Sequence, residues 1–269
     1  MTELLAATLT QRALTRRAAS GPRAVEPVSP AALSDEVAVL LLADMAPESV
    51  VWGWSRLVRG PRALRSTPCL RFAKVLGSGY EGGFGLRPSK SRQGLFAIFS
   101  NEAAADEFIH FSDVTAGYRQ HSREYCILKM KAWSTRGSWD SIQFTPSTLM
   151  PSAGPIATLT RASIQLPKAT AFWRYAPAAQ RSLESAPGCQ LAVGLGEAPF
   201  LRQATFSVWD SVGAMDAYAR SGAHLEAIRA AHANQFFSES LFVRYLPLEI
   251  TGVWKGCRYP LARTVNHAS

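Results

Sequence analysis

The chain has 269 residues, 47% of them hydrophobic and 18% charged, and its net charge is +9. A chain of this length buries a real core and forms one large or two small globular domains. The longest apolar run, near Val37 to Ala43, is only long enough for a strand, so the composition excludes a membrane-spanning helix. No long hydrophobic segment follows Arg12, Arg16 and Arg17, which predicts a cytoplasmic protein without a secretory signal.

Cysteine spacing and the pattern of basic residues exclude two further classes. The four cysteines, Cys69, Cys126, Cys189 and Cys257, are widely spaced and form no C-x-x-C pair, so we expect neither a disulfide framework nor a zinc site. The positive charge favours anionic partners, such as lipid head groups, an acidic protein or the propionates of a haem. The arginines are scattered singly and form no basic block, so nucleic-acid binding is not expected.

Composition divides the chain into five segments. Residues 1–35 are rich in Ala, Arg, Ser and Pro and are predicted to be a mobile basic tail, with a short amphipathic helix on a membrane as the alternative. A Pro- and Ser-rich stretch predicts a linker at 141–155. The linker separates two similar halves, 36–140 and 156–256, and residues 257–269 are a C-terminal tail.

The two halves are a tandem repeat. An offset of 119 residues pairs Trp54 with Trp173, and the offset then drops to 110 where the first half has a longer glycine-rich loop. It rises to 115 near the end, where Trp139 pairs with Trp254. Because the offset changes where loops are expected, a genuine duplication explains the pattern.

Each half reads strand, helix, strand, strand, helix, strand. The second half shows this order most clearly, with a strand at 156–164, a helix at 168–185, a hairpin over 190–197 and 202–210, a helix from Ser211 to His232 and a strand at 240–250. That order predicts an α+β fold of tandem ferredoxin-like repeats, βαββαβ twice. Two such sheets facing each other form an intrachain version of a dimeric α+β barrel, with a cavity between sheets and helices.

Catalytic motifs are scarce. The segment GSGYEG, Gly77 to Gly82, matches a dinucleotide-binding pattern, but it lies between two predicted strands and is interpreted as a turn. The sequence contains no G-x-S-x-G, H-E-x-x-H or C-x-x-C-H motif. Any cofactor is therefore expected to be held non-covalently.

Two histidines share the segment SGAHLEAIRAAH. Helical phase places His232 on the core-facing stripe with Leu225 and Ile228, and it leaves His224 beside the small side chains of the same helix. His224 pairs with Val114 in the repeat comparison, so it is peculiar to the second half. Small neighbours leave room for a flat macrocycle, which makes His224 a candidate metal ligand, although an ordinary polar or packing role stays open.

Several segments resemble one enzyme family. LTRASI from residue 159, the stretch from GLGEAPFLRQ at 194 to LEAIRAA at 231, FFSESLFVRY from 236 and TRGSWDS from 135 are similar to spheroidene monooxygenase, the acyclic-carotenoid ketolase of purple photosynthetic bacteria. The resemblance covers roughly residues 36 to 256. It implies oxygenation at C-2 of acyclic carotenoids such as spheroidene, with molecular oxygen, reduced ferredoxin and a haem as cofactor.

The same resemblance suggests site residues. His224 would be the axial iron ligand, by analogy with haem proteins built on tandem ferredoxin-like barrels. Arg161, Arg202 and Arg244 would bind haem propionates or a distal oxygen species, or would be ordinary exposed strand arginines. A non-catalytic binding protein for haem or another apolar ligand and a cofactor-free oxygenase of this fold stay open as alternatives. Because carotenoids reside in membranes, a peripheral contact with the inner membrane is expected.

Overall fold

The computed structural model describes residues 35–151, 153–198 and 200–259. Both predicted tails, 1–35 and 257–269, therefore lie largely outside the described residues. The exception is a short strand, β9 (Cys257–Tyr259), which forms a hairpin with the preceding strand where the sequence predicted tail. No helix among the described residues combines the length and apolar character needed to cross a bilayer.

The first half has the predicted order of elements. Short 3-10 turns at Pro47–Ser49, Gly60–Leu64 and Tyr80–Gly82 add to it. The elements in chain order are β1 (Val37–Met45), α2 (Val50–Arg59), β2 (Leu70–Gly79), β3 (Pro88–Phe99), α3 (Glu102–Phe111), α4 (Asp113–His121) and β4 (Ser122–Gly137).

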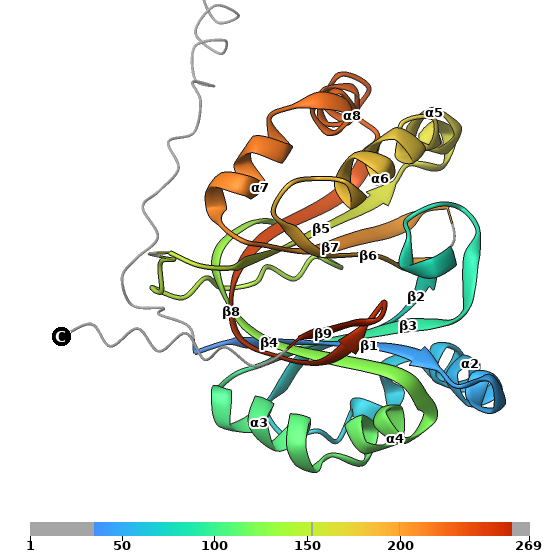
Figure 1. Ribbon diagram of the computed structural model, residues 1–269, viewed down its shortest axis with the longest axis vertical. Helices are drawn as coiled ribbons and strands as arrows, with labels where there is room; N and C mark the ends of the chain where they lie inside the picture. Colours follow the sequence, from blue (N-terminus) through green and yellow to red (C-terminus); the bar gives the residue numbers. More distant parts are fainter. Residues whose placement is uncertain (1–34, 152, 199, 260–269) are drawn as a thin grey trace, which may run out of the picture. The chain divides into compact units, whose positions relative to one another are not determined.

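The second half repeats this order (Figure 1). A 3-10 turn at Leu166–Lys168 precedes its first helix. Its elements are β5 (Ile156–Ile164), α5 (Ala169–Trp173), α6 (Ala176–Glu184), β6 (Cys189–Ala198), β7 (Arg202–Trp209), α7 (Val212–Ala219), α8 (Gly222–Ala233) and β8 (Phe237–Trp254).

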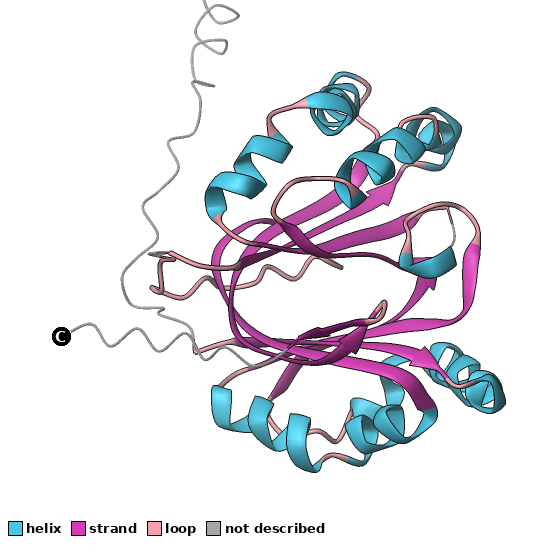
Figure 2. Ribbon diagram, viewed as in Figure 1, coloured by secondary structure: helices cyan, strands magenta, loops and turns pink. Residues whose placement is uncertain are grey.

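The strands form a closed antiparallel barrel in the order β4-β1-β3-β2-β6-β7-β5-β8, with β8 pairing back to β4. The two seams between the halves differ. The β4–β8 seam runs from Cys126–Gly252 to Gly137–Leu241, whereas the β2–β6 seam holds only Gly77–Gly196 and Ser78–Leu195. The helices of each half cover the outer face of its own sheet (Figure 2). The predicted fold class is confirmed.

The barrel interior is filled by apolar side chains. Alternate residues of β1 point to opposite faces, so Leu40 and Leu42 face the interior while Val39 and Leu41 face the helices. The interior cluster has 25 buried residues among those described, contributed by both sheets. The interior between the two sheets is therefore a packed core, and the predicted cavity between sheets and helices does not extend into it.

The last predicted helix, Ser211 to His232, is two helices in the structure. The chain breaks at Ser221, whose backbone is extended, and α8 starts at Gly222 with a φ of +55°. His232 lies in the last turn of α8 and is exposed, and no side chain of α8 is buried. The prediction that His232 lies on the core-facing stripe is therefore wrong.

The glycine-rich loop between β2 and β3 is the turn that the sequence predicted. A Cβ on Gly79 would lie 2.1 Å from the carbonyl oxygen of Gly83, so the turn closes too tightly for a side chain. The loop also reaches the second half, because the backbone N–H of Phe84 donates to Gln180 Oε1 on α6 at 3.2 Å. The Phe84 ring packs against the helical layer of that half.

The predicted linker, 141–155, is anchored to the barrel at its first residues. Phe144 is buried in the barrel interior. The backbone N–H of Thr145 donates to Glu36 Oε2 at 3.1 Å. β5 begins at Ile156, where the second repeat was predicted to begin.

Candidate functional site

His224 lies in the helical layer of the second half. Its ring stacks on Tyr218 of α7 with centroids 4.5 Å apart and planes inclined by 26°. Tyr218 packs in turn against Trp209 of β7 and donates its hydroxyl to the Ala179 carbonyl of α6 at 3.4 Å. Contacts from a strand and two helices therefore fix the ring on which His224 rests.

The chemistry of His224 suits a metal ligand. Burial lowers the pKa of its imidazole, so the ring is neutral near pH 7 and keeps a lone pair. Within the described part of the chain, neither ring nitrogen has a hydrogen-bond partner. The ring is half-buried and retains access from outside.

The donor set around His224 restricts the kind of metal centre. No group of three or more His, Cys, Asp or Glu side chains could hold a metal ion anywhere in the described ranges. A single imidazole holds a metal firmly only when other ligands come with the metal, as the four nitrogens of a porphyrin do. The described residues around His224 therefore do not supply the ligand set that a bare metal ion needs.

The helical layer of the second half has a small fully buried apolar cluster, with partly buried side chains packed against it. Its buried apolar cluster has four described members, Ile156, Leu183, Trp209 and Met215. α8 contributes no buried side chain to this layer. The small side chains of Ala227 and Ala231 follow His224 at one and two turns along the same helix.

Arg244 is the one of the three predicted arginines that lies on this side of the sheet. Its guanidinium pairs with Asp216 of α7 at 3.0 Å and lies over Trp133. β8 alternates, so its neighbours Val243 and Tyr245 point the other way, into the barrel interior.

Arg161 and Arg202 lie elsewhere, at one end of the barrel. Arg161 is 1% exposed and pairs with Glu239 of β8 and with Glu197 of β6, the latter at 3.1 Å. Arg202 is half exposed and lies 3.9 Å from the same Glu197. Since β5 alternates, Arg161 is on the opposite sheet face from the helices, and the structure does not bring either arginine to His224.

The residues around Arg161 form a charged end cluster, which we define as Lys74, Asp140, Arg161, Glu197 and Glu239. Lys74 pairs with Glu197 at 2.7 Å and also with Asp140. The carboxylates neutralise the buried guanidinium, as a buried charge requires. The guanidinium of Arg161 is therefore already paired with protein carboxylates at this end of the barrel.

Glu239 is the most strongly perturbed carboxylate of the end cluster. Burial would raise its pKa, but hydrogen bonds from the Ser141 N–H, the Ser138 hydroxyl and the Arg161 guanidinium lower it to about 2. The carboxylate therefore stays ionised and cannot act as a general acid near neutral pH.

A buried tryptophan lies at or just after the end of each of the two long strands, β4 and β8. Trp139 follows β4 and stacks on Phe96, with ring centroids 5.6 Å apart, while Trp254 ends β8. Glu239 accepts the backbone N–H groups of residues 140 and 141, and Glu124 accepts those of residues 255 and 256 in the same way. In each half, the turn beside the tryptophan is thus held by hydrogen bonds to a glutamate of the other half.

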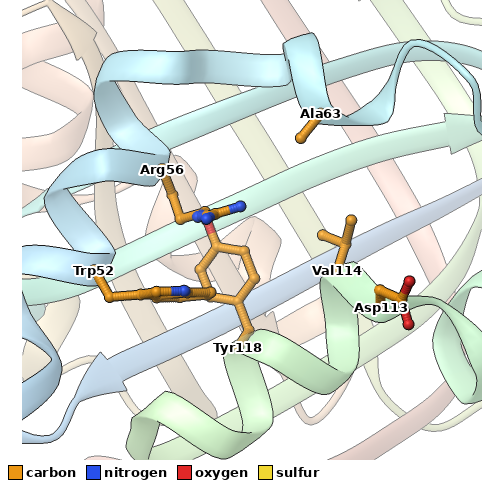
Figure 3. Close-up of a pocket in the computed structure, with 6 residues that line it drawn as sticks. All are labelled: Trp52, Arg56, Ala63, Asp113, Val114 and Tyr118. Atoms are coloured by element: carbon orange, nitrogen blue, oxygen red, sulfur yellow. The ribbon is translucent and has the colours of Figure 1, made fainter.

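The first half has a pocket where the repeat places the counterpart of His224. Its volume is about 250 Å³, and Val114 occupies the position that His224 has in the second half. Arg56 lies against the Tyr118 hydroxyl in this pocket, beside the indole of Trp52 (Figure 3). The pocket lining also includes Ala63 and Asp113. It offers no histidine or other soft metal ligand among the residues that line it.

Comparison with known proteins decides the family. The chain is 59% identical over 224 residues to spheroidene monooxygenase of Rubrivivax gelatinosus, which covers 83% of this chain and 87% of the relative. It is 34% identical to spheroidene monooxygenase of Rhodobacter capsulatus over 81% of this chain and 91% of that relative. The chain belongs to the spheroidene monooxygenase family. No family model matches it.

The fold of this spheroidene monooxygenase family member also occurs among solved structures. A crystal structure of an aldoxime dehydratase aligns with a TM-score of 0.52 and 11% identity, over 80% of this chain and 82% of that one. At this identity the likeness shows the shared fold and nothing about activity.

Sequence reasoning on this family member proposed His224 and Arg161 as site residues but missed the carboxylates and the lysine that surround Arg161 in the end cluster. Glu239, Glu197 and Lys74 carry no motif and lie on three different strands. One signal was available, because the offset of 115 that pairs Trp139 with Trp254 also pairs Glu239 with Glu124. A paired tryptophan and a paired glutamate at one offset predict a repeated contact.

Proposed function

We propose that this protein is a monooxygenase that introduces oxygen at C-2 of acyclic carotenoids such as spheroidene. One observation carries the proposal, namely 59% identity to a spheroidene monooxygenase along 87% of that relative's length. Oxygenating a hydrocarbon C–H bond needs a strong oxidant, and no amino-acid side chain supplies one. A cofactor must therefore carry the chemistry.

The proposed cofactor is a haem held by His224 in the helical layer of the second half. When bound, the haem would supply the activation of molecular oxygen that side chains cannot. Three features support this placement: a neutral imidazole, ring nitrogens without a hydrogen-bond partner in the described chain, and no protein cluster able to hold a bare metal ion there. Of the three arginines, only Arg244 lies on this face, so it is the proposed partner for a propionate.

The protein's own residues would orient the His224 ring and the Arg244 guanidinium toward the proposed cofactor. Stacking on Tyr218 fixes the plane of the His224 ring, and the Tyr218 hydroxyl is itself held by the Ala179 carbonyl. Such support keeps a metal-ligating histidine from rotating away from its metal. Asp216 holds the Arg244 guanidinium at 3.0 Å, so a propionate would share that guanidinium with a carboxylate.

Reduced ferredoxin is the proposed electron donor, as the family resemblance implies. A net charge of +9 favours an acidic donor, because complementary charge speeds productive encounters. The carotenoid is the proposed substrate, and its polyene requires an apolar surface beside the haem.

Absorption spectroscopy tests the cofactor. The haem-loaded protein should show a Soret band that is lost or shifted in His224→Ala. His232→Ala is the matched control, since His232 lies on the same helix but is exposed. An unchanged spectrum in His224→Ala would remove His224 as the ligand.

Turnover tests the activity separately. Haem-loaded protein supplied with spheroidene, oxygen and a ferredoxin reducing system should yield a ketone product, detected by mass spectrometry. No product would favour a non-catalytic haem or carotenoid carrier and defeat the monooxygenase proposal. Equal product from haem-free protein would instead favour a cofactor-free oxygenase.

A further inference from the structure

α2 exposes a stripe of large apolar side chains. Val51 is 81% exposed, Trp54 is 52% exposed and Val58 is 83% exposed. Their spacing of three and four residues places them on one side of the helix. We call these three residues the α2 stripe. Isolated apolar residues are common on protein surfaces, but a continuous stripe marks a contact surface.

Basic residues gather at the C-terminal end of the α2 stripe, whereas the exposed Glu48 precedes α2. From Ser49 to Arg65 the sequence has no Asp or Glu and four basic residues, namely Arg56, Arg59, Arg62 and Arg65, whereas Arg71 and Lys74 further on pair with carboxylates. Arg59, Arg62 and Arg65 are exposed at the end of α2 and in the turn that follows it. Basic residues beside exposed apolar ones are complementary to an anionic bilayer surface. The same positive charge disfavours pairing of this surface with a second copy of the chain.

The fold itself does not need the exposed valines of the α2 stripe, as the second half shows. At the repeat offset of 119, Val51, Val58 and Arg65 correspond to Thr170, Pro177 and Glu184. The second half builds the same layer on its sheet without them (Figure 1). The two valines and the nearby arginine are therefore particular to the first half.

The neighbouring hairpin extends the surface. The Trp54 indole N–H donates to the Lys90 carbonyl at 2.9 Å, which joins α2 to the start of β3. The tip of the β2–β3 hairpin adds Tyr80 at 47% and Leu86 at 48% exposure. Arg87 lies 3.9 Å over the Tyr80 ring, so the tip combines aromatic and basic groups, with Glu81 as its acidic member.

We propose that the α2 stripe docks this protein on an anionic lipid bilayer. Val51, Trp54 and Val58 enter the head-group region, where aromatic and aliphatic side chains are favoured. Arg59, Arg62 and Arg65 contact lipid phosphates. This docking rests on surface residues and does not depend on the proposed haem or its ligand. For the proposed function, it would place the protein at the membrane from which an apolar substrate must come.

Sedimentation of the full-length protein with vesicles tests the docking. The wild type should bind phosphatidylglycerol–phosphatidylcholine vesicles and bind pure phosphatidylcholine at least tenfold more weakly. Val51→Ser with Val58→Ser should weaken binding to the anionic vesicles at least tenfold, because it removes two apolar side chains that enter the head-group region. Both side chains are over 80% exposed, so the variant should fold like the wild type. Arg59→Gln, Arg62→Gln and Arg65→Gln together should do the same.

Two matched controls separate a specific surface from general stickiness or charge. Phe111→Ser removes an apolar side chain that is 76% exposed on another helix, α3. Arg136→Gln, Arg220→Gln and Arg258→Gln together remove three exposed positive charges elsewhere. Both controls should bind vesicles like the wild type. The N-terminal residues are present in every variant, so they cannot create a difference between them.

The proposal is overturned if the wild type fails to bind anionic vesicles, or if the α2 variants bind as well as the controls. A change of oligomeric state in the α2 variants, measured without vesicles, would instead assign the surface to a second copy of the chain. His224→Ala should retain vesicle binding, so failure of the haem proposal and failure of the docking proposal give different results.

Discussion

The helical layers of the two halves differ, although both cover the same kind of sheet. In the first half the buried cluster between helices and sheet has 14 described members, whereas in the second half it has four. α3 and α4 contribute Phe108, Ile109 and Tyr118 to the first layer, while α8 contributes no buried side chain to the second. The first half therefore has the larger buried cluster in its helical layer, and that layer also holds the pocket lined by Trp52, Arg56 and Tyr118.

The contacts of Trp139 and Trp254 also differ between the halves. The Trp139 indole N–H donates to Glu197 Oε1 at 2.8 Å, inside the charged end cluster. The Trp254 indole nitrogen has no hydrogen-bond partner among the described residues. Polar and apolar contacts together thus hold Trp139, whereas mainly apolar packing holds Trp254.

Trp139→Ala should give the largest effect and should sharpen this contrast. Removing a buried tryptophan costs about 3–5 kcal/mol through lost burial and the cavity left behind. Trp254→Ala should cost less, because the Trp254 indole makes no hydrogen bond among the described residues, whereas Trp139→Ala removes one donor to Glu197. Urea unfolding at pH 7 measures both. Equal or reversed losses would show that the end cluster does not help to hold Trp139.

Glu239→Gln should give the next largest effect. It leaves the buried Arg161 guanidinium short of one carboxylate, at a cost of about 3 kcal/mol. Glu124→Gln, its counterpart in the repeat, faces no buried arginine and should cost only about 1 kcal/mol for two weakened hydrogen bonds. Equal free energies of unfolding for the two variants would show that Glu239 and Glu124 stabilise their turns to the same extent.

The stability added by Glu239 should depend on pH in the acid range. Its folded pKa of about 2 lies below the ordinary 4.5, so the unfolded chain takes up a proton first as pH falls. The difference in unfolding free energy between wild type and Glu239→Gln should be constant from pH 7 to 5. It should then shrink between about pH 4.5 and 2. A difference that persists at pH 2 would contradict the lowered pKa.

His224→Val should give the smallest effect, since it installs the residue found at position 114 of the first half. Burial lowers the folded pKa of His224, so protonation favours the unfolded chain as pH falls below about 6.5. The wild type should lose unfolding free energy between pH 7 and 5, and the variant should lose less. If the unfolding free energies of the two haem-free proteins changed in parallel with pH, His224 would be exposed to water rather than buried in the helical layer.

Much of the fold followed from the sequence. The repeat offsets, the strand and helix periodicities and the turn at GSGYEG are local patterns, because each depends on neighbours within one element. His224 also stood out locally, as a histidine without a counterpart at Val114. The break at Ser221 was missed, and His232 is exposed because α8 contributes no buried side chain to the core.

The sequence alone therefore determined the duplicated βαββαβ order, the family resemblance and the singular histidine. Only the tertiary structure decided which sheet face each arginine occupies, that the barrel interior is packed, and that Glu239 holds the turn beside Trp139 across the repeat boundary. The physical reason is the distance along the sequence between the residues that interact. Periodicity reports which residues share a face, whereas the burial of Arg161 at 1% exposure depends on carboxylates that arrive from strands far along the chain.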